Sequence, residues 1–490
     1  MILLGYSCAV TDSSPLYLAV ADDLAQLIGA GALKAHERVP SVRQLARQRR
    51  VSITTAVASL RELEQRGLIE ARPKSGYFVA RRRPQLAPAT PVELPKRARL
   101  AGTQAVLKKM AEASLDPGLA RLGQALPDPA LFPERALRAS LIRAVRRDPK
   151  LLGEYPVRMG GSPALRAQIA RHYARIGVAL TVEDLVITNG CTEALTLAMR
   201  VVARPGDTIA VESPTYFGVL RAAEDHGVKV IEIPSHPRDG LSVDAVRDLL
   251  AGRAGRDVRA VVLMPSFNNP NGSCMPLPAR RELVRLARQA DIVLVEDDIY
   301  GDLHFEGSRP LPCKAFDTDG RVLLCSSFTK WLAPGSRTGF ITPGRFRDTL
   351  RSAKQMLSGA TPLAQQQMLA DFMASGRCER HLRTLRRQLH QQLAQLAQCV
   401  QDAFPAGTRL THPLGGFVLW VELPEGIDTQ ALYDEAVRQR ADYVPGPLFS
   451  AAGHYRNCLR LNAGYPVTEA TRAAIRRLGR LLAAQLPAVR

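Results

Sequence analysis

The sequence predicts an α/β protein of two parts, in which a small N-terminal winged helix-turn-helix unit is joined by a linker to a large unit with a mostly parallel sheet. Residues 14–83 carry three helical apolar patterns and then a hairpin pattern. Beyond residue 116, short apolar runs alternate with helical patterns, as is typical of α/β folds. The chain of 490 residues is also too long for a single core.

Composition limits the class of protein. Hydrophobic residues make up 46% of the chain, and no apolar run is long enough to span a bilayer. The N-terminus lacks the features of a secretion signal, so we expect a cytoplasmic protein. The eight cysteines are dispersed without metal-ligand spacing, which predicts reduced thiols and no metal site. The net charge is +20, and residues 1–100 carry 16 basic against 8 acidic residues, which suits a polyanionic partner.

Helix signals define the N-terminal unit. Apolar residues at helical spacing predict a first helix through Tyr17, Ala21, Leu24 and Ile28. Ser41 is expected to cap a second helix and Ser52 to cap a third that runs to about Gln65. Residues 68–79 then predict a β-hairpin, or wing.

Two helices joined by a tight turn and followed by a hairpin favour binding to double-stranded DNA. We expect the helix that begins at Ile53 to enter the major groove, with hydroxyl groups at its N-terminus facing phosphates or base edges. The candidate DNA contacts are Ser41, Arg43, Arg50, Ser52, Thr54, Thr55, Lys74 and Gly76. A three-helix module for contact with another protein is the alternative.

The next segment, residues 84–115, is predicted to be a linker. Repeated prolines exclude a continuous helix or central strand there: Pro84, Pro88, Pro91 and Pro95. The strands expected after it include residues 185–188, 208–211, 260–264, 292–295 and 322–325. In parallel sheets a ligand lies at the carboxyl ends of the strands.

One such strand end carries the most informative motif of the chain. Lys330 follows Ser327 by three residues and precedes Arg337 by seven. A lysine amine can form a Schiff base with the aldehyde of pyridoxal phosphate (PLP), and an arginine can hold the phosphate through a planar fork of donors. Ser327 can reach the same phosphate.

Other strand ends carry residue types that suit the same cofactor. Gly190, Cys191 and Thr192 begin a helix whose N–H groups can cradle a phosphate. Tyr216 can stack on a pyridine ring, and a carboxylate such as Asp297 can pair with a protonated ring nitrogen. Asn269 and Tyr300 can bond the ring oxygen. Singly, each also fits a common turn, rim or loop position.

Two resemblances follow from these motifs. Val39-Pro40-Ser41-Val42-Arg43-Gln44-Leu45-Ala46 and the segment Gly67 to Val79 resemble the GntR family of bacterial regulators. The ordered pocket segments resemble fold-type I PLP enzymes, the class I and II aminotransferases, over residues 120–485. Together the two halves resemble the MocR subfamily of GntR-family regulators.

The second resemblance implies an aminotransferase-like domain over residues 116–490, with a smaller C-terminal α+β subdomain from about residue 365. It also implies that Arg460 receives a ligand carboxylate and that Tyr155 reaches across the interface of a homodimer. Three residues depart from the family patterns. Asn271 replaces the usual Thr, Cys191 replaces Ser or Ala, and Ile53 stands where relatives carry a polar residue.

We therefore expect a PLP-dependent transcriptional regulator that responds to an amino acid, an amine or PLP through a Schiff base on Lys330. An active aminotransferase with an N-terminal DNA-binding module is the first alternative, because no catalytic residue is missing. A regulator with a structural, cofactor-free pocket is the second.

Overall fold

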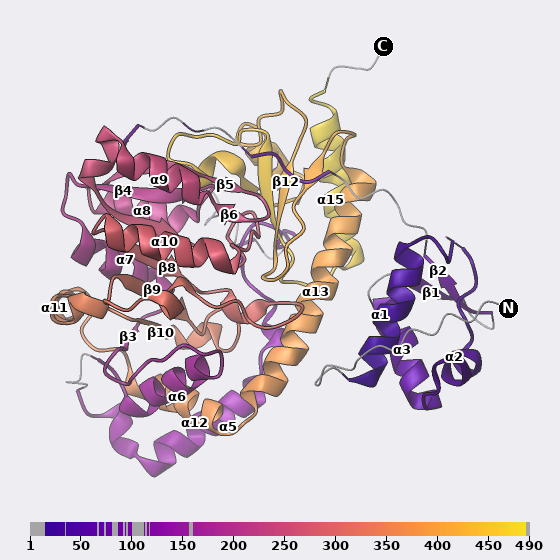
Figure 1. Ribbon diagram of the computed structural model, residues 1–490, viewed down its shortest axis with the longest axis horizontal. Helices are drawn as coiled ribbons and strands as arrows, with labels where there is room; N and C mark the ends of the chain where they lie inside the picture. The colour runs from indigo at the N-terminus through magenta and orange to yellow at the C-terminus, as the bar shows by residue number, and fades with distance from the viewer. Residues whose placement is uncertain are drawn as a thin grey trace. The chain divides into compact units, whose positions relative to one another are not determined.

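The protein divides into two compact units, Met1–Gln85 and Leu86–Arg490. The computed structural model describes residues 15–34, 36–65, 68–72, 75–80, 87–91, 94, 97–99, 112, 115–116, 118–155 and 160–486. Figure 1 labels many of the helices and strands of both units.

The N-terminal unit is a winged helix-turn-helix, as predicted. Its elements are α1 (Leu16–Gly29), α2 (Val42–Arg49), α3 (Ile53–Gln65), β1 (Ile69–Arg72) and β2 (Gly76–Val79). Ser41 caps α2 in a reciprocal capping box with Gln44, and Ser52 Oγ accepts the N–H of Thr55 at 3.0 Å. The strands pair antiparallel, so they form the expected wing. The unit has its own core, which includes Ala21, Leu24, Leu45, Leu60 and Val79.

An eight-stranded sheet forms the centre of the larger unit, in the order β3-β10-β9-β8-β7-β4-β5-β6. Neighbours from β9 to β5 run parallel. At one end of the sheet β10 pairs antiparallel with both β9 and the edge strand β3, and at the other end β6 pairs antiparallel with β5. The strands are β3 (Val186–Thr188), β4 (Thr208–Ser213), β5 (Lys229–His236), β6 (Gly240–Leu241), β7 (Val258–Leu263), β8 (Val293–Asp297), β9 (Val322–Ser327) and β10 (Gly339–Ile341).

Helices cover both faces of this sheet. On β4, Ile209 and Val211 belong to the core under α7, whereas Ala210 between them belongs to the core under α9 and α10. This alternation is the two-residue period of a strand that is buried on both sides. The helices up to this point are α5 (Glu134–Arg147), α6 (Pro163–Ala174), α7 (Cys191–Val202), α8 (Phe217–Asp225), α9 (Val243–Ala251) and α10 (Leu277–Gln289).

The C-terminal part carries a second, four-stranded antiparallel sheet in the order β11-β12-β14-β13. Its strands are β11 (Arg409–Leu410), β12 (Val418–Glu422), β13 (Val444–Pro445) and β14 (Cys458–Asn462). The remaining helices are α11 (Arg347–Leu357), α12 (Leu363–Ala374), α13 (Cys378–Ala403), α14 (Tyr433–Arg438) and α15 (Glu469–Ala483). This sheet lies inside the predicted C-terminal subdomain, whose boundary near residue 365 stays a prediction.

Part of the predicted linker is packed against the larger unit. Ala89 is 6% exposed within the core of the C-terminal sheet, and Arg99 pairs with Val230 of β5 in an antiparallel bridge. The linker predicted over residues 84–115 is thus packed against the larger unit at these positions, and its boundaries stay a prediction. Its basis, the proline content, excludes helices and central strands but does not exclude an extended segment that packs on a surface.

Candidate cofactor and effector pocket

A cavity of about 490 Å³ lies at the carboxyl ends of β4, β7, β8 and β9. This is the edge of a parallel sheet where ligands bind. Ten of the residues predicted from the sequence line it together: Cys191, Thr192, Tyr216, Asn269, Asp297, Tyr300, Ser327, Lys330, Arg337 and Arg460.

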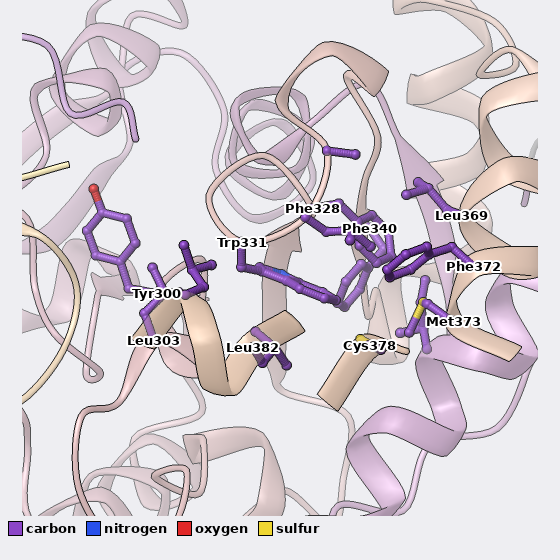
Figure 2. Close-up of a cluster of buried hydrophobic side chains, with 14 of the residues drawn as sticks. Tyr300, Leu303, Phe328, Trp331, Phe340, Leu369, Phe372, Met373, Cys378 and Leu382 are labelled. Carbon is purple, nitrogen blue, oxygen red and sulfur yellow. The ribbon is translucent and has the colours of Figure 1, made fainter. Parts of the chain in front are cut away.

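Lys330 lies in a loop that large aromatic side chains anchor. Phe328 and Trp331 are 1% and 3% exposed, and both pack in one cluster with Phe340 (Figure 2). His172 stacks on the Trp331 ring with centroids 5.6 Å apart. Because the residues on both sides of Lys330 are fixed in the core, its side chain has a defined direction into the cavity.

The amine of Lys330 is buried and held by the backbone. Its Nζ donates a hydrogen bond of 2.7 Å to the carbonyl oxygen of Ala125. Burial lowers the pKa of Lys330 to about 8, helped by the charges of Arg460 and Arg337 and opposed by Asp297. A lysine with this pKa is partly neutral near physiological pH, and the neutral amine is the nucleophilic form.

Asp297 is the last residue of β8 and lines the same cavity. Its Oδ1 accepts the N–H of Ile299 at 3.1 Å and lies 3.5 Å from the Cys191 Sγ. Burial raises the pKa of Asp297 to about 6, although these two donors lower it. A buried carboxylate of this kind is costly without a cationic partner, so the position favours a protonated ring nitrogen. Cys191 therefore serves as a neighbour of Asp297 in addition to its place at the start of α7.

Two groups along the cavity wall suit a polar aromatic ligand. The Tyr300 hydroxyl is buried and has no hydrogen-bond partner. The Asn269 side-chain oxygen accepts a hydrogen bond of 2.9 Å from Nη1 of Arg460. Tyr216 lines the same wall and packs beside Phe217, with ring centroids 4.9 Å apart. A buried hydroxyl without a protein partner that lines a cavity indicates a hydrogen bond to a ligand.

The turn before α7 is shaped for an anion. Gly190 has φ +88°, and a Cβ there would lie 2.9 Å from the Arg337 guanidinium. Arg337 lines the cavity and donates a long hydrogen bond of 3.5 Å to the Asn189 carbonyl. Glu193 holds the turn by accepting the Asn189 N–H at 2.6 Å. The N–H groups that begin α7 and the Arg337 cation therefore converge on one end of the cavity.

Arg460 also lines the cavity and is 1% exposed. One Nη binds Asn269, the other donates to the Gly123 carbonyl, and Nε has no partner. Burial lowers the pKa of Arg460 to about 10, against the attraction of Tyr300 and Tyr216. A buried cation with an orphaned donor is suited to a carboxylate.

The segment Gly123–Leu126 was not anticipated from the sequence. Its residues Gln124, Ala125 and Leu126 line the cavity, and its carbonyls bind Lys330 and Arg460. Asp442 fixes the segment by accepting the Gly123 N–H at 3.0 Å. The segment has neither charge nor periodicity, and its contacts lie more than 200 residues away along the chain, so no local signal pointed to it.

Tyr155 is not part of this cavity. Its side chain belongs to the large exposed hydrophobic residues and is 79% exposed. A role across a dimer interface stays a prediction.

The DNA-contact candidates differ in their surroundings. Arg43, Arg50, Ser52, Thr54 and Gly76 are exposed, and Ser41 is half-buried at its cap. Thr55 is also half-buried, with its hydroxyl 2.8 Å from Ser52 Oγ, so both hydroxyls are engaged at the start of α3. Lys74 lies outside the described residues. Arg38, which was not predicted, places its guanidinium beside the Gly76 turn.

Comparison with known proteins gives the same division of the chain. The model of the family "Aminotransferase class I and II" matches residues 135–478, and that of "Bacterial regulatory proteins, gntR family" matches residues 16–79. The chain belongs to the class I and II aminotransferase family. Its N-terminal helix-turn-helix unit, here named the reader unit, is of the GntR type. This combination is the architecture of the MocR subfamily.

A regulator and two enzymes illustrate the two similarities. The uncharacterized HTH-type transcriptional regulator YjiR of Escherichia coli K12 is 38% identical over 94% of this chain and 98% of its own length. A Pyrococcus horikoshii kynurenine aminotransferase, solved in complex with PMP (the amine form of the cofactor), is 29% identical with a TM-score of 0.73, over 78% of this chain and 95% of that one. The α-aminoadipate aminotransferase LysN of Thermus thermophilus, solved with a phosphopyridoxyl-leucine, is 30% identical with a TM-score of 0.70, over 78% and 96%.

The described residues also bear on membranes and metals. None of the helices in the described part of the chain has the length and apolarity to cross a membrane. Within the same residues, no group of three His, Cys, Asp or Glu side chains is placed to hold a metal ion.

Proposed function

We propose that this MocR-type protein is a transcriptional regulator that binds PLP on Lys330 and changes its affinity for operator DNA when an amino acid, an amine or PLP itself fills the pocket. The observation that carries the proposal is the convergence of Lys330, Asp297, Arg337 and Arg460 on one cavity. These groups supply an amine, a partner for a ring nitrogen and two separate anion sites.

The residues fit the cofactor in detail. Gly190, Cys191, Thr192, Ser327 and Arg337 would hold the phosphate. Tyr216 would stack on the ring, Asp297 would pair with its nitrogen, and Asn269 and Tyr300 would bond its oxygen. When bound, PLP supplies an aldehyde that condenses with amines and a ring that withdraws electrons.

The protein's own groups then account for recognition of the effector. Arg460 would take its carboxylate, at the position that the Gly123 carbonyl holds in this structure. The neutral side chains of Gln124, Leu126 and Phe217 line the same cavity and would contact the rest of the effector. Lys330, lying between Asp297 and the Ala125 carbonyl, is placed to hold or release a proton at Nζ.

The N-terminal unit would bind double-stranded DNA through the exposed start of α3 and through Arg43 and Arg50. Ile53, which is 58% exposed at that position, is placed to contact a thymine methyl group. A homodimer is supported by apolar side chains exposed around one region of the larger unit. Tyr155 and Met356 are 79% and 84% exposed, and Tyr155 Oη lies near Gly359. Two reader units would then meet paired half-sites.

The test is a titration of the purified protein with PLP, followed by mobility shifts on the DNA upstream of its own gene. We expect a yellow protein whose cofactor becomes fixed to Lys330 by borohydride, and whose DNA shift changes with individual amino acids. A protein that takes up no PLP contradicts the pocket assignment. Steady transamination with an unchanged DNA shift would instead favour the aminotransferase alternative.

A further inference from the structure

The first described residues after the reader unit form a strap over the larger unit. We define the strap as residues 87–91, 94 and 97–99. At its start, the Ala87 carbonyl accepts the N–H of Leu410 at 3.0 Å, which extends the edge strand β11. Thr90 donates both its N–H and its hydroxyl to the Glu422 carboxylate, each at 2.6 Å. Arg409 donates to the Thr90 hydroxyl at 2.8 Å. This end of the strap is therefore bound to the C-terminal sheet.

The far end of the strap is bound to the large sheet. Arg99 and Val230 exchange both backbone hydrogen bonds, at 3.0 and 2.8 Å, on β5. Ala98 packs against the core beneath that sheet. The strap thus connects two sheets through backbone hydrogen bonds at each end.

The effector site is divided between the same two sheets. Lys330 and Asp297 follow or end strands of the large sheet, whereas Arg460 lies on β14 of the C-terminal sheet. Arg460 is paired with Trp420 of β12, and Glu422, which binds Thr90, lies two residues further along β12. A ligand that bridges Lys330 and Arg460 therefore acts on the two bodies that the strap joins. Because a packed sheet moves as a rigid body, any change in their relative position reaches the strap.

We propose, on the basis of the proposed function, that the strap is the output element of the sensor. It converts a change between the two sheets into a change at the start of the larger unit, from which residues 80–86 lead to the reader. Coupling of this kind requires that the effector favour one position of the C-terminal sheet over another. The physical connection is the pairing of β14, which carries Arg460, with β12, which carries Glu422.

Hydrogen exchange of the full-length protein tests the strap directly. Four amides report on it: those of Thr90, Arg99, Val230 and Leu410. We expect PLP together with a pool of the standard L-amino acids to change the exchange rate of at least two of them tenfold or more, relative to PLP alone. If the visible absorbance shows that the pool has reacted in the pocket and all four rates stay within twofold, the proposal is wrong.

Glu422→Ala provides the functional test, because it removes both acceptors of Thr90 while leaving the pocket residues intact. We expect it to take up PLP and amino acids as the wild type does and to bind DNA, but to lose at least four-fifths of the change in DNA affinity that the amino-acid pool produces. Glu425→Ala is the matched control, since Glu425 is exposed and lies just beyond the end of β12. If the amino-acid pool changes the DNA affinity of Glu422→Ala as much as that of Glu425→Ala, the proposal is wrong. A wild type that takes up no PLP overturns the proposed function, and the strap proposal with it.

Discussion

The carbonyl oxygen of Ala125 lies 2.7 Å from the Nζ of Lys330 and accepts its hydrogen bond. Two residues earlier, the Gly123 carbonyl accepts a hydrogen bond from Arg460. One short segment thus engages both the amine that would hold PLP and the arginine that would take a carboxylate. This segment would have to move when a carboxylate reaches Arg460. Its anchor is Asp442, which binds the Gly123 N–H.

Gly123→Ala is expected to displace this segment, because a Cβ at Gly123 would clash with the Asp442 carboxylate. We expect PLP uptake to become several-fold faster as the Ala125 carbonyl leaves Lys330, at a cost of about 1–3 kcal/mol in stability for the overpacked site. Stopped-flow absorbance measures the rate. Gly153→Ala is the control, since no atom lies within 4 Å of a Cβ there. If PLP uptake is unchanged in Gly123→Ala as well as in the control, the Ala125 carbonyl does not restrict access of PLP to Lys330.

Lys330→Ala is expected to abolish borohydride-stable attachment of PLP, because no other amine lines the described part of the cavity. Intact-protein mass spectrometry after reduction measures the attachment. Lys150→Ala, at an exposed lysine that pairs with Glu154 on the surface, should label like the wild type. Equal labelling of the Lys330 variant would show that the Schiff base forms elsewhere.

PLP uptake should depend on pH through Lys330. Its pKa is lowered to about 8, chiefly by burial, so the neutral, nucleophilic amine becomes the main form as the pH rises through about 8. We expect the PLP uptake rate to level off above that pH, whereas with an ordinary lysine the rate would continue to rise up to about pH 10.4. Arg460→Gln removes a neighbouring positive charge, so its midpoint should move upward. A midpoint that stays the same would exclude an electrostatic effect of Arg460.

Lys354 and Glu193 form a buried ion pair of 3.0 Å behind the phosphate turn. Lys354→Met leaves Glu193 without its cation and should cost about 3–5 kcal/mol. Urea unfolding can be followed by tryptophan fluorescence, because both tryptophans, Trp331 and Trp420, lie in the larger unit. Adding Glu193→Leu to Lys354→Met should restore part of the lost stability. If it does not, the unpaired charge of Glu193 is not the cause of the loss.

The same pair predicts the direction of a pH effect. Burial alone would raise the pKa of Glu193, but hydrogen bonds from Ser358 and the Asn189 N–H, together with Lys354, lower it overall. A carboxylate with a lowered folded pKa stabilises the protein above its unfolded value, 4.5, and this contribution is lost as the pH falls through the folded pKa. The stability difference between wild type and Lys354→Met should therefore shrink below about pH 4.5.

Arg43→Ala is expected to weaken binding to all DNA sequences alike and to lower the salt dependence of binding by about one phosphate contact. Fluorescence anisotropy at several salt concentrations measures both. Arg49 is a suitable control position, because it already pairs with Asp23 at 2.8 Å. If Arg43→Ala and Arg49→Ala behave alike, the predicted contact of Arg43 with the DNA phosphates is wrong.

The strand ends could be predicted from the sequence because they are local. Gly190, Asp297 and Lys330 each follow a short apolar run, and parallel strands bring their carboxyl ends to one edge. Arg460 came only from family resemblance, since an arginine inside an antiparallel strand has no distinguishing pattern.

What the sequence did not reveal depends on contacts between distant segments. Thr90 binds Glu422 across 332 positions, and Gly123 binds Asp442 across 319. Neither strap nor pocket segment has the periodicity of a helix or strand, and a proline-rich stretch looks the same whether it is free or packed. Only the folded chain shows which surface it covers.

The reader unit completes its own hydrophobic core, and the chain passes to the strap a few residues after Val79. The DNA-binding unit and the effector-binding unit are thus separable modules of the chain. Grafting a reader with a different operator preference in front of residue 86 would place a chosen promoter under the chemical control of this pocket, which makes the scaffold a starting point for genetically encoded amine sensors.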